Sequence, residues 1–373
     1  MPGALAARAE ALLARHWWRP QTTCLSALLL PLAHLYAWLS QRAARRAIPV
    51  PLPVPVLVVG NVIAGGAGKT PTVIALVQAL RAAGHRPGVI SRGHGRGSPG
   101  VRQGGRQSMQ LDVQPVRPDS TAQQVGDEPL LLHRRCAVPV WVGSNRSAAA
   151  LALCAAHPEV DVLVSDDGLQ HHRLTRSAEL LVFDDRGIGN GRLLPAGPLR
   201  EPLPLRLQAH QWVLYTGTRV STVLPGWLAQ RSLAQAWPLA AWHAGDATQA
   251  LPLAALRGRR LRAAAGLGDP EKFFGMLEAA GLSIARLPLP DHHDYATLPW
   301  PAVPDDAADR TDRTDRAGGT DTVTTEKDAT KLDPARPGIG AVWVLPLDLG
   351  VPPELVSQLL AQLFPHPDTK PRT

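Results

Sequence analysis

From residue 53 onward, short apolar runs alternate with longer segments whose apolar residues are spaced as on one face of a helix. The run at 53–60, PVPVLVVG, is continuous, which is typical of a strand buried on both faces of a parallel sheet. The next segment, 70–85, has helical spacing and Gly84 near its end. Further buried strands are expected at 87–91, 138–143, 160–167, 178–185 and 211–217. This alternation predicts a doubly wound, mostly parallel α/β sheet.

A second, smaller α/β unit is expected from residue 258. Its pattern predicts a strand at 262–267, a helix at 270–280 and strands at 321–325 and 341–346. The segment 305–319, DDAADRTDRTDRAGG, has no apolar side chain larger than alanine and is expected to be a solvated, flexible loop. The predicted organisation is an N-terminal segment, 1–50, a core domain, 51–257, a C-terminal lobe, 258–350, and a tail, 351–373.

The N-terminal segment contains the apolar run CLSALLLPLAHLYAWL at 24–39, followed by Arg42, Arg45 and Arg46. It is too short and too polar to predict a membrane span, and it starts too late for a cleaved signal peptide. Two interpretations remain open. The run forms either a helix buried against the main domain, or an interfacial helix whose aromatic and arginine side chains anchor it among anionic lipid headgroups.

Composition limits the class of protein. Hydrophobic content of 45% and charged content of 19% exclude wholesale disorder, and no apolar run is long enough for a polytopic membrane protein. The three cysteines, Cys24, Cys136 and Cys154, lack metal-binding spacing and indicate a reducing compartment. The net charge of +8 suggests an anionic partner: nucleic acid, a phosphorylated ligand or a membrane face. Lysine is scarce, because arginine supplies most of the positive charge, so each lysine is worth examining for a specific role. The five are Lys69, Lys272, Lys327, Lys331 and Lys370.

The segment that follows the first strand, GNVIAGGAGKT at 60–70, predicts a phosphate-binding loop. Its small residues allow backbone N–H groups to close around phosphates at a helix N-terminus. Lys69 would reach the β- and γ-phosphate oxygens, and Thr70 could ligate magnesium. Ile63 stands where the general pattern has glycine, but the strand–loop–helix context still favours nucleotide binding.

A P-loop enzyme needs an acidic residue at the end of another strand to position Mg²⁺. Asp166 and Asp167 meet this requirement, because they follow a buried strand and so lie at the edge of the sheet where ligands bind. An ordinary Asp-Gly turn is the alternative. The pair Asp184 and Asp185 after the next strand is a weaker copy of the same pattern.

Three further motifs leave alternatives open. SRGHGRG at 91–97 could bind phosphate or a phosphorylated substrate, or form a flexible loop. GDEP at 126–129 could be catalytic or could begin a helix, where carboxylates are favoured. DHHD at 291–294 could bind a metal or act as an acid or base, although adjacent histidines alone are a weak signal.

Together with other motifs, in one order along the chain, these segments resemble the tetraacyldisaccharide 4′-kinase family. The likeness covers about residues 20–348 and rests on GNVIAGGAGKTPT, SRGHGRG, GDEPLLL, DDGLQHHRL, GNGRLLPAGPLREP, GLGDPEKFF, PDHHDY and TTEKDATKL. DDGLQH and LLPAGPLREP are far more specific than GKT. In this family Ile63 is the usual residue of the loop, whereas His94 stands in place of a tyrosine.

The resemblance implies a two-lobed P-loop kinase with an N-terminal hydrophobic helix. Such an enzyme would use ATP and Mg²⁺ to phosphorylate the 4′-hydroxyl of a tetraacylated glucosamine disaccharide 1-phosphate in lipid A biosynthesis. It would work as a peripheral protein at the cytoplasmic face of the bacterial inner membrane. Its partners would be the lipid-linked substrate and the membrane surface, with no nucleic acid and no obligate protein partner expected.

The resemblance also implies roles for individual residues. Asp127 would be the general base, paired with His292 from the second lobe, which would require lobe closure before transfer. Lys69 would act in catalysis, and Thr70, Asp166 and Asp167 would hold or neighbour the metal. The expected nucleotide contacts are Ile63, Ala64, Gly65, Gly66, Ala67, Gly68, Lys69 and Thr70. The expected substrate contacts are Arg92, Glu128 and Arg200.

A regulatory P-loop NTPase, such as a metal-delivery or partitioning GTPase, is the alternative from another class. It would explain the P-loop and the DDG motif, but not the hydrophobic N-terminal run or PDHHDY, and the chain has no evident NKxD motif. Nucleic-acid binding ranks third, because the arginines are spread along the chain.

Overall fold

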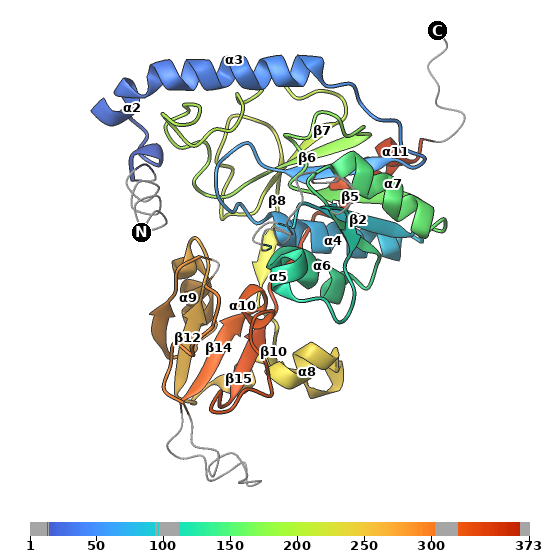
Figure 1. Cartoon of the computed structure of the whole chain (residues 1–373). Coiled ribbons are helices and arrows are strands. Elements are labelled where there is room, and N and C mark those ends of the chain that lie inside the picture. The colour runs from blue at the N-terminus through green and yellow to red at the C-terminus, as the bar shows by residue number, and fades with distance from the viewer. Residues whose placement is uncertain are drawn as a thin grey trace, which may run out of the picture.

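The computed structural model describes residues 13, 15–93, 96, 112–291, 293–302 and 320–365. The predicted loop at 305–319 lies outside these residues. The larger lobe is built on an eight-stranded sheet in the order β3-β4-β2-β5-β1-β6-β7-β8, in which only β3 runs antiparallel to its neighbour (Figure 1). Along the chain its strands are β1 (Val56–Gly60), β2 (Pro87–Ser91), β3 (Gln114–Pro115), β4 (Val140–Val142), β5 (Val162–Asp166), β6 (Ala178–Phe183), β7 (Gln211–Tyr215) and β8 (Trp227–Leu228).

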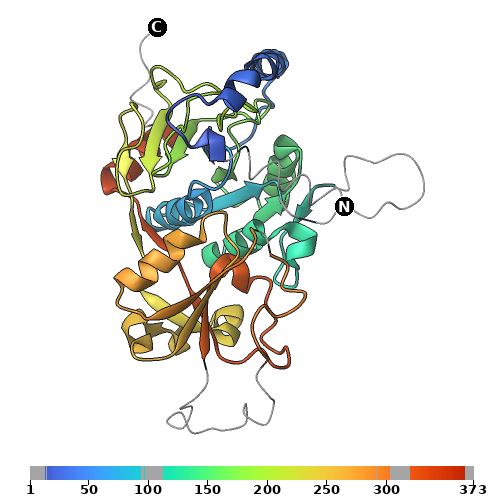
Figure 2. The ribbon, with the colours of Figure 1, turned by 90° about the vertical axis from the view of Figure 1, so that its left-hand side faces the viewer.

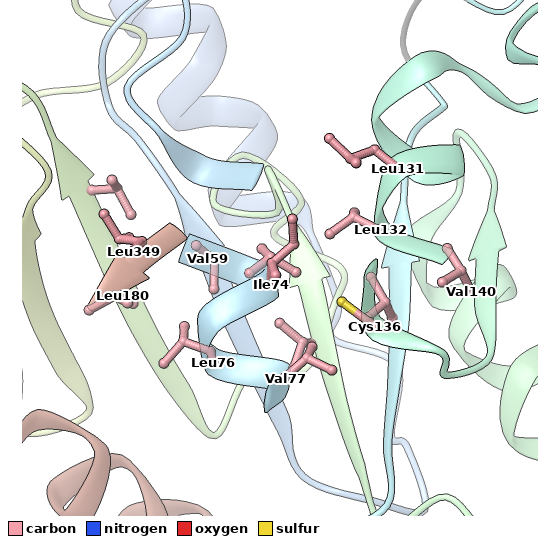
Figure 3. Packing of buried hydrophobic residues seen from close by; sticks show 14 of the residues in the cluster. Val59, Ile74, Leu76, Val77, Leu131, Leu132, Cys136, Val140, Leu180 and Leu349 are labelled. Carbon is pink, nitrogen blue, oxygen red and sulfur yellow. The ribbon is translucent and has the colours of Figure 1, made fainter. Parts of the chain in front are cut away.

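Helices cover both faces of this sheet, as the α/β pattern predicts. Along the chain they are α4 (Lys69–Ala82), α5 (Ala122–Val125), α6 (Asp127–Cys136) and α7 (Arg146–Ala156). Because α7 returns the chain from β4 to β5, against the direction taken by α4 and α6, a right-handed crossover puts it on the opposite face. Figure 3 shows α4 and α6 side by side against the sheet, with Ile74 and Val77 of α4 facing Leu132 and Cys136 of α6.

The smaller lobe is a six-stranded sheet in the order β11-β10-β15-β14-β12-β13. Its strands are β10 (Gln235–Pro238), β11 (Leu251–Pro252), β12 (Leu261–Ala265), β13 (Ile284–Pro288), β14 (Asp321–Thr325) and β15 (Val342–Leu345). Its helices are α8 (Leu239–Ala244), the 3-10 turns Ala247–Gln249 and Leu253–Leu256, α9 (Pro270–Ala279) and α10 (Glu326–Ala329). A two-stranded ribbon of β9 (Gln230–Ser232) and β16 (Asp348–Gly350) is the remaining sheet.

Two predicted boundaries need correction. The smaller lobe begins before residue 258, because β10 pairs antiparallel with β15 and so belongs to the second sheet. Within the predicted tail, α11 (Pro353–Leu363) buries Leu355, Leu359 and Leu363 and contacts α4 and β6 of the larger lobe. The chain therefore crosses to the smaller lobe and returns.

The N-terminal run forms two helices, α2 (Cys24–Leu28) and α3 (Leu30–Arg46), which meet at Leu29. In Figures 1 and 2, α3 lies at the end of the molecule opposite to the smaller lobe. Tyr36 Oη donates a hydrogen bond to the carbonyl of Arg200 at 2.8 Å, which ties α3 to the segment that follows β6. No helix among the described residues is long and apolar enough to cross a bilayer.

Candidate active site

The glycine-rich loop leads directly from β1 into α4, which begins at Lys69. Gly65 and Gly68 have φ angles of 87° and 84°, in the region that favours glycine. A Cβ atom on Gly68 would lie 2.9 Å from the hydroxyl of Thr216, and this hydroxyl donates to the carbonyl of Ala67 at 2.7 Å. The loop is thus held in shape by its neighbours, with the N-terminus of α4 available to an anion.

The predicted nucleotide-binding residues differ in exposure. The Ile63 side chain is completely buried, whereas Gly65 and Gly66 are exposed. Ile63 forms a β-bridge with Leu199, and the N–H of Ala64 donates to a carbonyl of the same 193–200 segment at 2.7 Å. The specific motif LLPAGPLR therefore supports the phosphate loop from behind.

The carboxylates that follow β5 lie beside the lysine of the loop, because β5 and β1 are parallel neighbours. Lys69 Nζ is 3.5 Å from Asp167 Oδ1 and donates to Asn61 Oδ1 at 3.1 Å. Arg200, a predicted substrate residue, donates to both carboxylate oxygens of Asp167 at 3.1 and 3.2 Å. The structure thus brings the GKT and DDG motifs together, as the sequence predicts.

The Asp166 carboxylate has the properties expected of a metal ligand. It is 2% exposed, and its Oδ2 accepts a hydrogen bond from Ser91 Oγ at 3.3 Å. Its Oδ1 is buried and has no hydrogen-bond partner among the described residues. Burial raises the pKa of Asp166 to about 7, and the nearby carboxylates of Glu128 and Asp167 add to this shift. A bound cation would satisfy this oxygen and stabilise the charge.

Asp167 behaves differently. Burial opposes its ionisation, but Lys69 and Arg200 outweigh burial and hold the pKa of Asp167 below its usual range. Among the residues that the structure describes, no group of three or more His, Cys, Asp or Glu side chains could hold a metal ion. Mg²⁺ does not require such a group, because it is usually bound through one or two carboxylates together with substrate phosphates and water.

Asp127 is the first residue of α6 and is 3% exposed. Lys331 Nζ lies 3.1 Å from its Oδ2, and Lys327 Nζ lies 4.0 Å from the same oxygen. Both lysines belong to the smaller lobe. The GDEP motif therefore begins a helix and also carries a buried carboxylate at the boundary between the lobes, so neither interpretation of it excludes the other.

The remaining predicted residues lie around this carboxylate or outside the described part of the chain. Glu128 is half-buried, 3.8 Å from Lys327. Arg92 is exposed just after β2. Asp291 lies 3.2 Å from Lys327, which brings the start of the DHHD motif to the same place. The predicted catalytic His292 and the loop residue His94 lie outside the described residues.

Sequence reasoning assigned no role to several charged residues at this site. Lys327 and Lys331 are the main omissions, and the scarcity of lysine was the signal that could have found them. A third lysine, Lys272 from α9, pairs with Asp184 at 2.8 Å. Arg146 is 2% exposed and donates to the carbonyl of Gly143 at 2.6 Å, and no local motif distinguishes it from the other arginines.

A phosphate loop, a carboxylate doublet beside its lysine and a further buried carboxylate define a P-loop phosphotransferase. The chain belongs to the family described as tetraacyldisaccharide-1-P 4′-kinase, whose model matches residues 25–364. This confirms the family predicted from the sequence, and with it the kinase interpretation over the regulatory NTPase.

Relatives support the same assignment. The tetraacyldisaccharide 4′-kinase of Leptothrix cholodnii is 52% identical over 84% of this chain and 83% of its own length. The tetraacyldisaccharide 4′-kinase of Methylibium petroleiphilum is 47% identical over 95% of this chain and 94% of its own length. The crystal structure of LpxK from Aquifex aeolicus in complex with ATP matches with a TM-score of 0.67 and 26% identity, over 91% of this chain and 100% of that one. ATP is thus the nucleotide expected from the family.

Proposed function

We propose that this chain transfers the γ-phosphoryl group of ATP to the 4′-hydroxyl of a tetraacylated glucosamine disaccharide 1-phosphate, a step in lipid A biosynthesis. One observation carries the proposal: the doublet Asp166–Asp167 lies beside the phosphate-loop lysine, and Glu128, the neighbour of the buried Asp127, is close enough to raise the pKa of Asp166. Family membership and the ATP-bound relative support the same reaction. Phosphoryl transfer depends mainly on positioning and charge neutralisation, which this arrangement can provide.

At the nucleotide end, the backbone N–H groups of Gly65–Gly68 and the N-terminus of α4 bind the phosphates, while Ile63 and Ala64 are held behind them by the 193–200 segment. Lys69 neutralises the β- and γ-phosphate oxygens. Asp166, Asp167 and Thr70 would hold Mg²⁺, since the buried Oδ1 of Asp166 has no hydrogen-bond partner among the described residues and can accept a cation. When bound, the ion would neutralise negative charge on the phosphates.

At the acceptor end, Asp127 takes the proton of the sugar hydroxyl as its oxygen attacks the γ-phosphorus. His292 completes the pair, as the family resemblance implies. Arg92 and Arg200 contact the phosphate of the substrate, a role that suits guanidinium groups, and Glu128 contacts the sugar. Because Asp127 and His292 come from different lobes, transfer requires the lobes to be together.

The test is an assay with the purified chain, ATP, Mg²⁺ and the disaccharide monophosphate. We expect a bisphosphate product that depends on the lipid, and we expect Lys69→Ala to abolish transfer while the thermal unfolding transition remains cooperative. Nucleotide hydrolysis at the same rate with and without lipid would contradict the proposal and favour the regulatory NTPase.

The exposed face of α3 supports peripheral binding to the cytoplasmic face of the bacterial inner membrane. Leu32, Leu35 and Leu39 are 53%, 53% and 52% exposed, and their spacing puts them on one side of the helix. Trp38 is 57% exposed, and the helix ends in Arg45 and Arg46. An apolar stripe next to aromatic and arginine side chains is typical of an interfacial helix.

Vesicle sedimentation tests this part of the proposal. The triple variant Leu32→Ser, Leu35→Ser, Leu39→Ser should bind anionic vesicles at least ~10-fold more weakly. Each leucine has about half of its side chain left to bury, so the three together contribute about 2 kcal/mol. Leu205→Ser is the matched control, since Leu205 is 97% exposed outside α3. Equal vesicle binding by the triple variant and the wild type would leave only the packing role of α3.

A further inference from the structure

The turn that carries Lys327 and Lys331 is fixed from behind by a buried carboxylate. Asp328 is completely buried, and both its oxygens accept from the N–H of Gly266 at 3.1 Å. Thr325, at the end of β14, donates its hydroxyl to Asp328 at 2.6 Å. These bonds anchor α10 to the smaller sheet. The two lysines, four residues apart on one side of this turn, therefore project from a rigid support.

The same turn is tied to the helix that begins with Asp127. Glu326 is 5% exposed and accepts from Arg135 Nη1 at 2.8 Å and from Trp242 Nε1 at 3.1 Å. Arg135 lies in the last turn of α6, and Asp127 is the first residue of that helix. Contacts at both ends of α6 therefore set the distance between the Asp127 carboxylate and the lysines of the smaller lobe.

The two lysines serve Asp127 unequally. Lys331 is 10% exposed, its Nζ forms an ion pair with Asp127 Oδ2 at 3.1 Å, and this nitrogen has no hydrogen-bond partner among the described residues. Lys327 lies farther from the same oxygen, at 4.0 Å. It is also shared, with Glu128 at 3.8 Å and Asp291 at 3.2 Å. The positive charge of Lys331 is therefore directed at Asp127, whereas that of Lys327 is divided among three carboxylates.

We propose that Lys331 is a positioning residue for the transfer, whose ammonium group fixes the Asp127 carboxylate and favours its ionised form. The inference rests on the role of Asp127 proposed above. The bond from the sugar oxygen to the γ-phosphorus forms as the bond to the β-phosphate oxygen breaks, and ADP leaves. The hydroxyl proton passes to Asp127. Lys331 neither receives this proton nor touches the substrate, and because it belongs to the smaller lobe, the base is complete only when the lobes meet.

Replacement of Lys331 by methionine tests the inference. We expect kcat to fall by about 10- to 100-fold, part of the usual worth of a general base, with the KM for ATP nearly unchanged. The acidic limb of the pH profile should move to higher pH by about 1 unit, because an opposite charge near a carboxylate favours its ionised form. Lys327 also faces Asp127, but it is shared with Glu128 and Asp291, so Lys327→Met should move the limb in the same direction by less.

Two further variants separate positioning from packing. Lys331→Arg keeps the charge and should restore kcat to within about 10-fold, with the acidic limb at its wild-type position. Arg259→Met is the matched control: it removes a cation of the same lobe, paired at 3.1 Å with Asp321 at the start of β14, the far end of the strand from α10. It should leave the pH profile unchanged.

The outcomes distinguish this inference from the proposed function. If Asp127→Asn has wild-type kcat, the role of Asp127 is wrong, whatever Lys331 does. If Asp127→Asn is inactive but Lys331→Met keeps the wild-type rate and acidic limb, only the positioning role is wrong. If Lys331→Met gives no cooperative unfolding transition, Lys331→Gln replaces it with the same expectations. If both fail to fold, a shifted limb in Lys331→Arg would overturn the inference, and an unshifted limb would support it.

Discussion

The strands β5 and β6 lie on either side of β1, and each is followed by a pair of aspartates, yet the two pairs differ in what their oxygens contact. Asp166 and Asp184 are 2% and 1% exposed, so burial does not distinguish them. Asp184 accepts from Arg186 Nε at 2.9 Å and from Lys272 Nζ at 2.8 Å. Asp166 accepts from one hydroxyl and keeps one oxygen without a hydrogen bond among the described residues.

The electrostatic consequence is opposite in the two pairs. Burial opposes ionisation of both carboxylates, but Arg186 and Lys272 hold the pKa of Asp184 below its usual range. At Asp166 burial prevails, and the pKa is raised to about 7. Arg186 also donates to the carbonyl of Gly66 and stacks on the ring of Trp18, 4.5 Å from its centroid. The second pair therefore braces the phosphate loop, whereas the first keeps acceptor capacity for a ligand.

The largest expected effect is on catalysis at Asp166. Asp166→Asn should lower kcat/KM by about 10³, because charge stabilisation through a bound metal is worth several kcal/mol and each 1.36 kcal/mol is tenfold. Asp185→Asn is the control from the other pair, and we expect it to stay within about threefold of the wild type. Steady-state kinetics at several Mg²⁺ concentrations measure both, and equal losses in the two variants would show that the pairs are equivalent.

The next effect is on stability at Asp184. Asp184→Asn should lower the free energy of unfolding by about 2–3 kcal/mol at pH 7, less than for a fully buried ion pair because Arg186 and Lys272 are partly exposed. A lowered native pKa contributes stability above the unfolded pKa of about 4, and this contribution is lost as the pH falls through the native pKa. The difference between variant and wild type should therefore shrink in acid.

Asp185→Asn again serves as control. Asp185 accepts from the N–H and hydroxyl of Thr218 at 2.7 and 3.0 Å, and an amide oxygen can accept the same bonds. Urea unfolding should detect a change below about 0.5 kcal/mol, as for other surface substitutions. If Asp185→Asn strongly lowers the free energy of unfolding and Asp184→Asn does not, then Asp185, and not Asp184, braces the phosphate loop.

The sequence predicted the parts of the fold that depend on contiguous residues. The strands expected at 53–60 and 178–185 contain β1 and β6, because continuous apolar runs bounded by turns are local signals. It missed β10 and α11, because a short strand is recognisable only through its partner β15, more than a hundred residues away. The packing of α11 on α4 and β6 likewise depends on distant residues.

The same distinction applies to the site. The phosphate loop and the DDG motif each carry their chemistry in adjacent residues, so their proximity followed from parallel strand order. The cations that pair with the carboxylates could not be predicted from strand order. Lys331 meets Asp127 across the lobe boundary, and Lys272 reaches Asp184 in the same way. The sequence ranks Asp184–Asp185 as the weaker pair, but the physical reason is not local, because Lys272, which neutralises Asp184, lies 88 residues away along the chain.

The last effect is a dependence of stability on pH whose sign is opposite to that at Asp184. A native pKa of about 7 means that the stability contributed by neutral Asp166 is present below the unfolded pKa of about 4 and is lost as the pH rises through 7. Asp166→Asn stays neutral at every pH, so without Mg²⁺ its free energy of unfolding should gain on that of the wild type by about 2–3 kcal/mol between pH 5 and pH 8. Urea unfolding at the two pH values measures this gain, and the comparison of slopes cancels any constant cost of the amide. Added Mg²⁺ should stabilise the wild type and not the variant, because only the carboxylate binds it well. A parallel pH dependence of the two proteins would mean that Asp166, like Asp184, has a partner that already compensates its charge.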